Sequence, residues 1–457
     1  MEPGTVEVGS GIEFEARKDV IGTNDVPVKG LMRHVLEAFE QERVRYCVLR
    51  DADRLDRQGG EVDLLVDPQD VGRLEHVLGP LSFVRLKDEE YAAHRLFLAY
   101  DSESDGWLKL DVIDRLEYGH RKVLGTSLTE RCLNDRRRFG LLFIPSPEAE
   151  LVALLFHCVL GKGCFDQARR DRCRALCTEI TDLASLSAML TTYWSPAMTA
   201  ARLIQTIQDD NWATLLTEKP TGAVTKRSIS GYEIARAGRG VLRRVGRRLP
   251  ALRPRTLTVA LLAPDGAGKT TLVHAIHESF QVPVRSLYMG LWRRASHSLS
   301  DQRLPGMGFV FRLFRLWTRY LVACYHRAYG RFVIFDRYVY DAMLPSRTPL
   351  SWHSRCRRWL LARACPAPDL LIVLDAPGEV LFGRKGEHNI ALLEQQRRAY
   401  LRLATRPGSI VVDATRDAEW VRREVTSFIW SAYASQTLGG RSNESRLGTR
   451  HALPRSG

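Results

Sequence analysis

The sequence contains a glycine-rich segment whose residue types and spacing suit phosphate binding. Residues 257–276 read LTVALLAPDGAGKTTLVHAI, an apolar run, a short loop and an amphipathic run. Gly266 and Gly268 allow backbone N–H groups to turn toward an anion. Lys269 can reach terminal phosphates, and Thr270 offers a hydroxyl to Mg²⁺ at a helix N-terminus. The candidate nucleotide-binding residues are Asp265, Gly266, Ala267, Gly268, Lys269, Thr270 and Thr271.

Charged residues also stand at the ends of two later apolar runs. Asp336 ends RFVIFD and is followed by Arg337, and Asp375 ends DLLIVLD. In open parallel sheets, ligands bind beyond the carboxyl ends of the strands. Asp336 is therefore a candidate for ordering Mg²⁺ together with Thr270, and Arg337 is a planar cation suited to a phosphate. Asp375 is either a further site residue or the N-cap of a helix.

Four segments carry a family resemblance in their order and spacing. They read APDGAGKTT, FDRYVYD, PDLLIVLDAP and GRKGEHNIALLEQQRRAYLRLA, and they lie within residues 257–430. This part of the chain resembles the thymidylate kinases among the P-loop nucleoside monophosphate kinases. The resemblance implies a five-stranded parallel sheet with helices on both faces, ATP on the loop, an acceptor pocket and a mobile lid.

The same resemblance implies roles for individual residues. Asp265 matches the loop aspartate near the acceptor sugar, and Asp336 with Arg337 match a pair that handles Mg²⁺ and the acceptor phosphate. Arg384 and Lys385 fall in the lid, where their charges would stabilise the transferring phosphoryl group. The expected catalytic residues are Lys269, Asp336, Arg337, Arg384 and Lys385.

Three carboxylates in the first half of the chain form a second candidate site. In GGEVDLLVD, Glu61 and Asp63 alternate with apolar residues, which places both on one face of a strand. Asp111 interrupts the apolar run LKLDVI. Carboxylates from two strands could hold two Mg²⁺ ions for nucleotidyl transfer, with a solvated strand face as the alternative. Residues 30–145 resemble the nucleotidyltransferase fold of the polymerase-β type.

Charge is distributed unevenly along the 457 residues. The net charge is +14, but residues 1–220 carry −9 and residues 221–457 carry +23. Such an excess indicates nucleic acid, an anionic membrane or phosphorylated substrates as partners. No recognition-helix motif or aromatic stacking pattern appears, so we expect no sequence-specific nucleic acid binding. A small-molecule phosphate acceptor is the expected partner, and homodimer formation is left open.

The N-terminus and the apolar stretches bear on localisation. The first 19 residues are acidic and lack the basic start and apolar core of a targeting signal, so we expect a cytoplasmic protein. The apolar stretch 309–329 is interrupted by arginines and could lie on a membrane surface but not span it. Residues 221–256 hold ten basic residues and one acid, and a helix there could contact anionic lipid.

Shifts in composition predict an α/β multidomain chain. The later apolar runs alternate with helical stretches, which is typical of a parallel sheet covered on both faces. Short strand-like runs in the first half indicate an α+β sheet followed by a helical appendage. The predicted segments are a flexible N-terminus (1–29), a nucleotidyltransferase-like domain (30–145), a helical appendage (146–220), a basic linker (221–256), a P-loop domain (257–435) and a disordered tail (436–457).

These features predict ATP- and Mg²⁺-dependent phosphoryl transfer in the C-terminal half. The acceptor would be a nucleoside monophosphate or another small molecule with a phosphate or hydroxyl group. Two alternatives stay open. The N-terminal carboxylates could catalyse nucleotidyl transfer, or the chain could be an ATP-binding switch or scaffold at a membrane surface.

Overall fold

The computed structural model describes most of the chain. The described residues are 28, 30–50, 52, 60–86, 94–118, 124–125, 127–218, 220, 225–226, 256–291, 307–346, 349–386 and 389–438. The predicted flexible N-terminus, apart from residue 28, and most of the predicted basic linker lie outside these residues, as does the tail beyond residue 438. Residues 436 and 437, which we expected in the tail, belong to the last helix.

The N-terminal part is built on a mixed five-stranded sheet in the order β1-β2-β5-β4-β3. Only β2 and β5 run parallel, and the other neighbouring pairs are antiparallel. The apolar faces of α1 and α2 pack on this sheet in one core. The bounds are α1 Gly30–Gln41, β1 Tyr46–Val48, β2 Glu61–Val66, α2 Val71–Leu78, β3 Val84–Leu86, β4 His94–Asp101 and β5 Gly106–Ile113.

Helices follow this sheet and enclose a second core around Phe156 and Tyr193. The helix α4 begins where the hydroxyl of Ser146 accepts a hydrogen bond from the N–H of Ala149, with Pro147 in the first turn. The bounds are α3 Leu128–Asn134, α4 Pro147–Phe156, a π-helical turn His157–Lys162, α5 Gln167–Glu179, α6 Leu183–Tyr193, α7 Ala200–Gln208 and α8 Trp212–Thr217, with the hairpin β8 Arg137–Phe139 and β9 Leu142–Ile144 before α4.

A small three-stranded sheet reaches into the segment that we expected to be a linker. Its order is β10-β7-β6, with β6 at Glu117–Tyr118, β7 at Leu124–Gly125 and β10 at Thr225–Lys226. Two residues of the predicted linker therefore pair with the N-terminal part of the chain.

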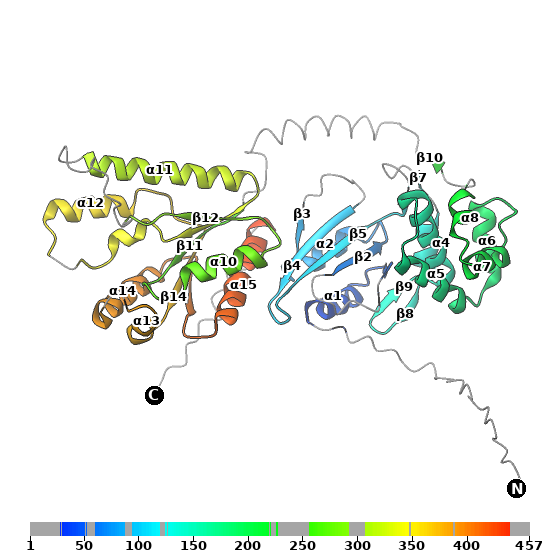
Figure 1. Cartoon of the computed structure of the whole chain (residues 1–457), viewed down its shortest axis with the longest axis horizontal. Helices are drawn as coiled ribbons and strands as arrows, with labels where there is room; N and C mark the ends of the chain where they lie inside the picture. Colours follow the sequence, from blue (N-terminus) through cyan, green and yellow to red (C-terminus); the bar gives the residue numbers. More distant parts are fainter. Residues whose placement is uncertain are drawn as a thin grey trace, which may run out of the picture.

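The C-terminal part contains the predicted parallel sheet. Its strand order is β12-β13-β11-β14-β15, and all four neighbouring pairs are parallel. Val259 and Leu261 of β11 pack on the side of α10 and α15, whereas Ala260 and Leu262 pack on the side of α11 and α14. Helices thus cover both faces, and the predicted fold class is confirmed (Figure 1). The strands are β11 Thr258–Leu262, β12 Val284–Tyr288, β13 Phe332–Asp336, β14 Leu370–Asp375 and β15 Ser409–Asp413. The helices are α10 Lys269–Ser279, α11 Met307–Ala328, α12 Trp352–Ala362, α13 Gly378–Lys385, α14 Ile390–Leu403 and α15 Ala418–Thr437, with a 3₁₀ turn at Val339–Met343.

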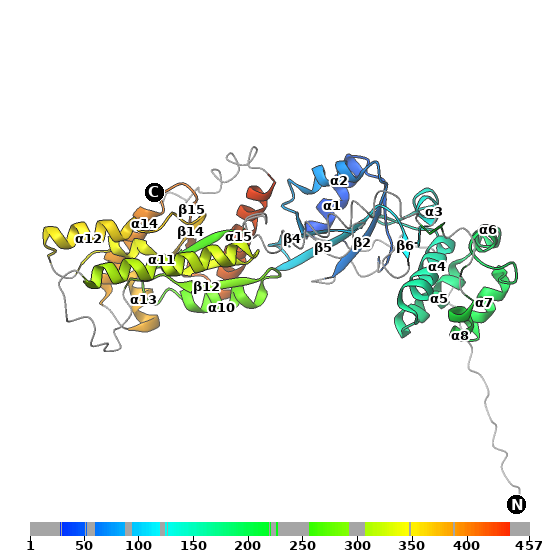
Figure 2. The same ribbon diagram turned by 90° about the horizontal axis from the view of Figure 1, so that it is seen from above.

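The two sheets meet through an aromatic cluster that belongs to both. The ring of Trp107 on β5 lies 4.9 Å from Trp430 on α15 and 5.0 Å from Phe280 after α10. The indole N–H of Trp107 donates to the carbonyl of Ser279 at 2.9 Å, and that of Trp430 donates to the carbonyl of Ser82 at 2.9 Å. Figure 2 shows β4 and β5 ending against α15. The strand that carries Asp111 therefore contacts the C-terminal end of the helix that carries Lys269.

Within the described part of the chain, no helix combines the length and the apolar character needed to cross a membrane. The longest helix among the described residues, α11, contains residues 309–328 of the apolar stretch, and arginines interrupt it as the sequence indicated.

Candidate functional site

The loop between β11 and α10 has the backbone that its glycines predict. Gly266 and Gly268 adopt φ values of +93° and +82°, in the left-handed region that favours glycine. A Cβ atom on Gly266 would lie 2.6 Å from the carbonyl oxygen of Leu381, so a side chain cannot be accommodated there without movement. A Cβ atom on Gly268 would meet nothing within 4 Å. Because Gly268 is the N-cap of α10, an anion at this loop would face the N-terminus of that helix.

Lys269 is folded into the loop. The residue is buried, with an exposure of 7%, and its Nζ donates to the carbonyl oxygens of Ala263 and Pro264, both at 2.8 Å. Burial and, to a lesser degree, Arg337 lower the pKa of Lys269 to about 8, although three neighbouring carboxylates raise it. A phosphate group in the loop would favour the charged amine and offer it oxygen atoms in place of the two carbonyls.

The candidate magnesium residues lie on neighbouring elements. Thr270 and Thr271 are exposed in the first turn of α10. Asp336 is half-buried at the end of β13, where it pairs in register with Leu261 of β11, two residues before the loop begins. Hydroxyl and carboxylate oxygens are hard donors of the kind that Mg²⁺ prefers. The donor set therefore fits this ion chemically.

Arg337 is held between two carboxylates. It forms an ion pair with Asp265 of the loop, and its Nη1 lies 3.6 Å from Oδ2 of Asp341. Asp341 is fully buried, and its Oδ1 accepts a hydrogen bond from the hydroxyl of Tyr400 at 2.9 Å. Burial raises the pKa of Asp341, whereas Arg337 lowers it. Arg337 also has a φ of +66°, a conformation that is costly for a side chain with a Cβ atom and recurs at functional sites.

The predicted lid cations lie on a helix. Arg384 and Lys385 are exposed in the last turn of α13, and Nη1 of Arg384 donates to the carbonyl of Ala414 at 2.9 Å. That bond ties α13 to the segment after β15, where Oδ1 of Asp413 accepts from the N–H of Thr415 at 2.9 Å. Residues 387 and 388, which follow in the predicted lid, lie outside the described residues.

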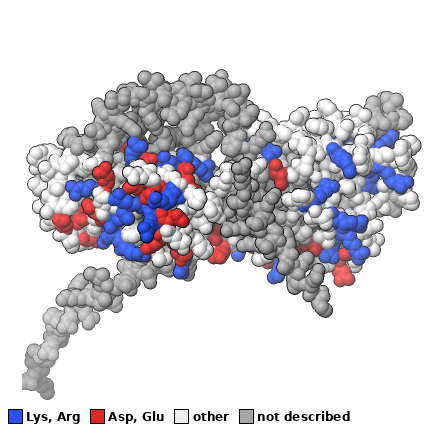
Figure 3. Space-filling model, turned by 180° about the vertical axis from the view of Figure 1, so that it is seen from behind, with Lys and Arg blue, Asp and Glu red and all other residues white. Residues whose placement is uncertain are grey.

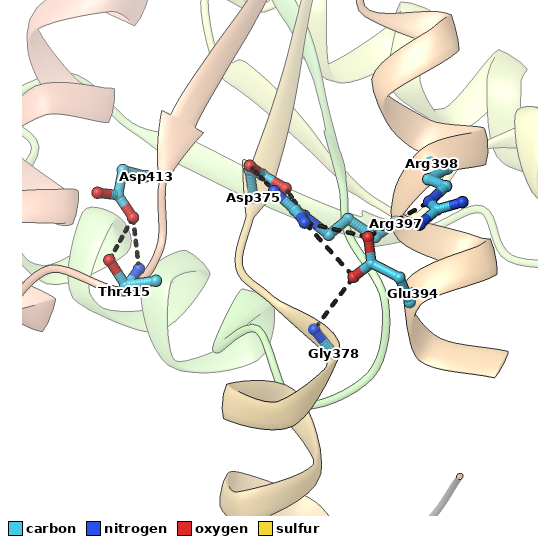
Figure 4. Close-up of polar contacts among 7 residues, drawn as sticks. All are labelled: Asp375, Gly378, Glu394, Arg397, Arg398, Asp413 and Thr415. Atoms are coloured by element: carbon cyan, nitrogen blue, oxygen red, sulfur yellow. Dashed lines mark hydrogen bonds and ion pairs between the residues drawn. The ribbon is translucent and has the colours of Figure 1, made fainter. Parts of the chain in front are cut away.

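Asp375 forms a paired network at the end of β14 rather than capping a helix (Figure 4). Its two carboxylate oxygens accept from Arg397 on α14, at 2.5 Å from Nε and 2.9 Å from Nη2. Glu394 accepts from Nη1 of Arg397 at 3.1 Å and from the N–H of Gly378 at 3.3 Å. The N-cap of α13 is Pro377, which offers no side-chain hydrogen bond. The N-cap interpretation of Asp375 is therefore wrong.

The three N-terminal carboxylates come together as the strand pattern predicts. Glu61 and Asp63 on β2 and Asp111 on β5 offer oxygen atoms that all lie within 4.8 Å of one another. Asp63 and Asp111 are direct partners in the parallel register of the two strands. Burial and then the charges of Asp111 and Asp63 raise the pKa of Glu61. Mutual repulsion of this kind is what a bound cation relieves.

Two basic side chains and a pocket border this cluster. Nδ1 of His94 lies 2.7 Å from Oδ2 of Asp111, and Nε of Arg50 lies 3.1 Å from Oδ2 of Asp63. A pocket of about 1150 Å³ reaches from Asp63 to the helices that follow the sheet, and Tyr118 also lines it. The hydroxyl of Tyr118 is buried without a hydrogen-bond partner among the described residues. The contributions of His94, Arg50 and Tyr118 were not foreseen from the sequence.

Comparisons with known proteins give a distant similarity to solved structures. No protein-family model matches the chain, and no curated protein matches it. Among solved structures, thymidylate kinase from Candida albicans is similar, with 18% sequence identity over 39% of this chain and 93% of that chain, and a TM-score of 0.32.

Proposed function

We propose that the P-loop domain transfers a phosphoryl group from ATP to a small acceptor carrying a phosphate or hydroxyl group. The observation that carries the proposal is the position of Lys269, a buried amine at the N-terminus of α10, inside a loop with two left-handed glycines. Backbone N–H groups, a helix N-terminus and an ammonium group together match a nucleotide polyphosphate better than any neutral ligand.

The residues around the loop would have separate roles. Lys269 and the loop amides would hold the β and γ phosphates, and Thr270 with Asp336 would hold Mg²⁺ through hard oxygen donors. When bound, the ion would neutralise charge on the phosphates during transfer. Because phosphoryl transfer depends on positioning and on charge neutralisation, these side chains need no covalent role.

Arg337 is the residue proposed to bind the acceptor. Its guanidinium group suits a phosphate or a phosphorylated sugar, and its contacts with Asp265 and Asp341 fix its direction. Arg384 and Lys385, at the end of α13, would add positive charge where the transferred group becomes most anionic. The identity of the acceptor beyond its phosphate or hydroxyl group is the open part of the proposal.

The test is a transfer assay with ATP labelled at the γ position. Thymidylate, other nucleoside monophosphates, nucleosides and phosphosugars would be offered with and without Mg²⁺. Lys269→Ala should lower turnover on the order of 10²-fold or more. Lys162→Ala is the matched control because Lys162 is an exposed lysine on the N-terminal part of the chain. Nucleotide binding without turnover on any acceptor would favour the ATP-binding switch instead.

A second candidate function is nucleotidyl transfer at the N-terminal carboxylates. The convergence of Glu61, Asp63 and Asp111 beside a pocket favours it. Its readout is Mg²⁺-dependent release of pyrophosphate from a nucleoside triphosphate. Asp63→Ala should abolish that release and leave γ-phosphoryl transfer intact. If transfer to the acceptor were lost in Asp63→Ala and kept in Lys269→Ala, the catalytic assignment would pass to the N-terminal site.

A further inference from the structure

A carboxylate lies inside the P-loop domain, next to the arginine proposed to bind the acceptor. Asp341, in the 3₁₀ turn that follows β13, is 1% exposed. No other carboxylate among the described residues of this domain is buried. A charged carboxylate is costly to bury unless it is paired and hydrogen-bonded. The contacts of Asp341 therefore indicate what this buried group does.

The two oxygens of Asp341 face partners from different parts of the domain. Oδ1 accepts a hydrogen bond from the hydroxyl of Tyr400 on α14 at 2.9 Å, and Oδ2 lies 3.6 Å from Nη1 of Arg337. Among the described residues Oδ2 has no hydrogen-bond partner, so its charge is balanced by the ion pair with Arg337. Tyr400 is also 1% exposed, which keeps bulk water away from its hydrogen bond. Because the hydroxyl fixes one oxygen, the other keeps facing the guanidinium group.

The side chain of Arg337 is confined by further neighbours. It forms an ion pair with Asp265 of the loop. A Cβ atom on Gly290 would lie 3.0 Å from Cδ of Arg337 and would overlap the hydroxyl of Tyr288. The side chain of Arg337 therefore lies in a space that depends on a glycine at position 290. It is still 24% exposed, so a ligand can reach it.

Tyr400 belongs to a helix that contacts this edge of the sheet twice. Arg397, three residues earlier on α14, pairs with Asp375 at the end of β14 (Figure 4). Residues three positions apart lie on one face of a helix, so this face of α14 contacts both the end of β14 and the turn after β13. The helix α14 follows Arg384 and Lys385 in the chain, and it therefore links the acceptor arginine to the predicted lid.

The surface of the domain suits an anionic acceptor. In Figure 3 the P-loop domain is mostly white and blue on the face shown, with little red. The field of a basic surface raises the concentration of anions near a site. Such a field attracts an anion but does not orient the group that binds it. The direction of Arg337 must come from its fixed neighbours.

We propose that Tyr400 is a positioning residue for the acceptor: it holds Asp341, which holds the guanidinium group of Arg337 toward a phosphate of the acceptor. The inference rests on the proposed phosphoryl transfer, because that proposal assigns the acceptor to Arg337. Since Tyr400 is buried, it acts through Asp341 and not by touching the acceptor. Removal of its hydroxyl leaves Lys269 and the loop amides in place.

The first experiment is the transfer assay with γ-labelled ATP and with thymidylate as the phosphorylated acceptor. Tyr400→Phe keeps the ring and should raise the KM for thymidylate about tenfold, with the KM for ATP unchanged. The matched control is Tyr100→Phe. The hydroxyl of Tyr100 donates to Asp105 at 2.5 Å, and Asp105 pairs with Arg422, so the same three residue types form a network where the N-terminal sheet meets α15. This variant should change neither KM.

A double-mutant cycle tests the positioning without turnover. Tyr400→Phe, Arg337→Met and the double variant are compared with the wild type in urea unfolding. The factor by which Tyr400→Phe changes the unfolding equilibrium constant should differ at least about threefold between the Arg337 and Met backgrounds. Tyr100→Phe should change it by the same factor in both backgrounds, because it is not in contact with Arg337.

Two results would overturn the positioning role. One is an equal factor for Tyr400→Phe in both backgrounds, and the other is an unchanged KM for thymidylate in an active Tyr400→Phe variant. The failure of the proposed function has a different signature. If the wild-type protein transferred phosphate to no acceptor while the cycle still showed coupling, the transfer would be refuted and the positioning of Arg337 by Tyr400 would stand.

Discussion

Nucleotide binding at alkaline pH should take up a proton at Lys269. Burial lowers the pKa of this amine to about 8 in the ligand-free protein, so at about pH 9 only about a tenth of the molecules carry the charge there. Phosphate oxygens at the amine favour its charged form and raise the pKa again. Binding of ATP with Mg²⁺ at this pH should therefore draw close to one proton from the buffer.

The lowered pKa of Lys269 also changes the free energy of unfolding of the ligand-free protein. A fall from 10.5 to about 8 corresponds to about 3 kcal/mol, at about 1.4 kcal/mol for each pKa unit. Because the folded pKa lies below the unfolded one, the unfolded chain binds more protons between these pH values. The penalty of burying the charge is complete below pH 8 and is relieved as the pH rises. Lys269→Met has no such penalty.

Two assays check this reasoning. Isothermal titration calorimetry in two buffers with different ionisation enthalpies measures the proton uptake directly. Denaturant unfolding of the wild-type protein and Lys269→Met across this pH range isolates the amine, because the buried cysteines and tyrosines titrate alike in both proteins. The free energy of unfolding of the wild type should gain about 3 kcal/mol relative to the variant. The burial of a titrating amine in the loop would be refuted by two results together. These are no proton uptake on binding, and a difference in the free energy of unfolding between the wild type and Lys269→Met that does not change with pH.

Three further predictions concern other parts of the chain. Trp107→Ala should lower the free energy of unfolding by about 3–5 kcal/mol and split one calorimetric transition into two, because its ring joins the two sheets at Trp430; an unchanged single transition would contradict this. Asp336→Asn should lower Mg²⁺-dependent turnover on the order of 10²-fold and raise the Mg²⁺ concentration needed, whereas unaltered Mg²⁺ dependence would remove this carboxylate from the site. Arg397→Lys should cost about 1–3 kcal/mol in urea unfolding by losing the two-pronged pairing with Asp375, and no loss would show that the pair contributes little.

The parallel sheet could be predicted because its strands are continuous apolar runs with helical stretches between them. Buried on both faces, such strands leave a signal that is readable without any tertiary information. The strand β3 leaves no such signal, because Val84–Leu86 has three residues, of which only Val84 is buried. This segment is a strand because it pairs with β4, and the local sequence does not encode that contact.

Some features of the candidate sites could likewise be predicted from the sequence, and others could not. The carboxylates on β2 and β5 could be brought together from strand periodicity, since Asp63 and Asp111 face the same side of parallel neighbours. The partners of Arg337 and Asp375 could not. Asp265 pairs with Arg337 across 72 positions of the chain, and Arg397 pairs with Asp375 across 22, with no periodic signal linking them.

The phosphate-binding loop could be predicted from the sequence alone. A strand, two glycines, a lysine and a hydroxyl residue lie within residues 258–270, where backbone conformation is a local property. The burial of Lys269, the position of Arg337 between two carboxylates and the exposure of the apolar face of α11 are visible only in the folded structure. Burial and ion pairing depend on what distant segments bring to a residue, so the pKa of a side chain and the exposure of a helix face appear only once the chain has packed.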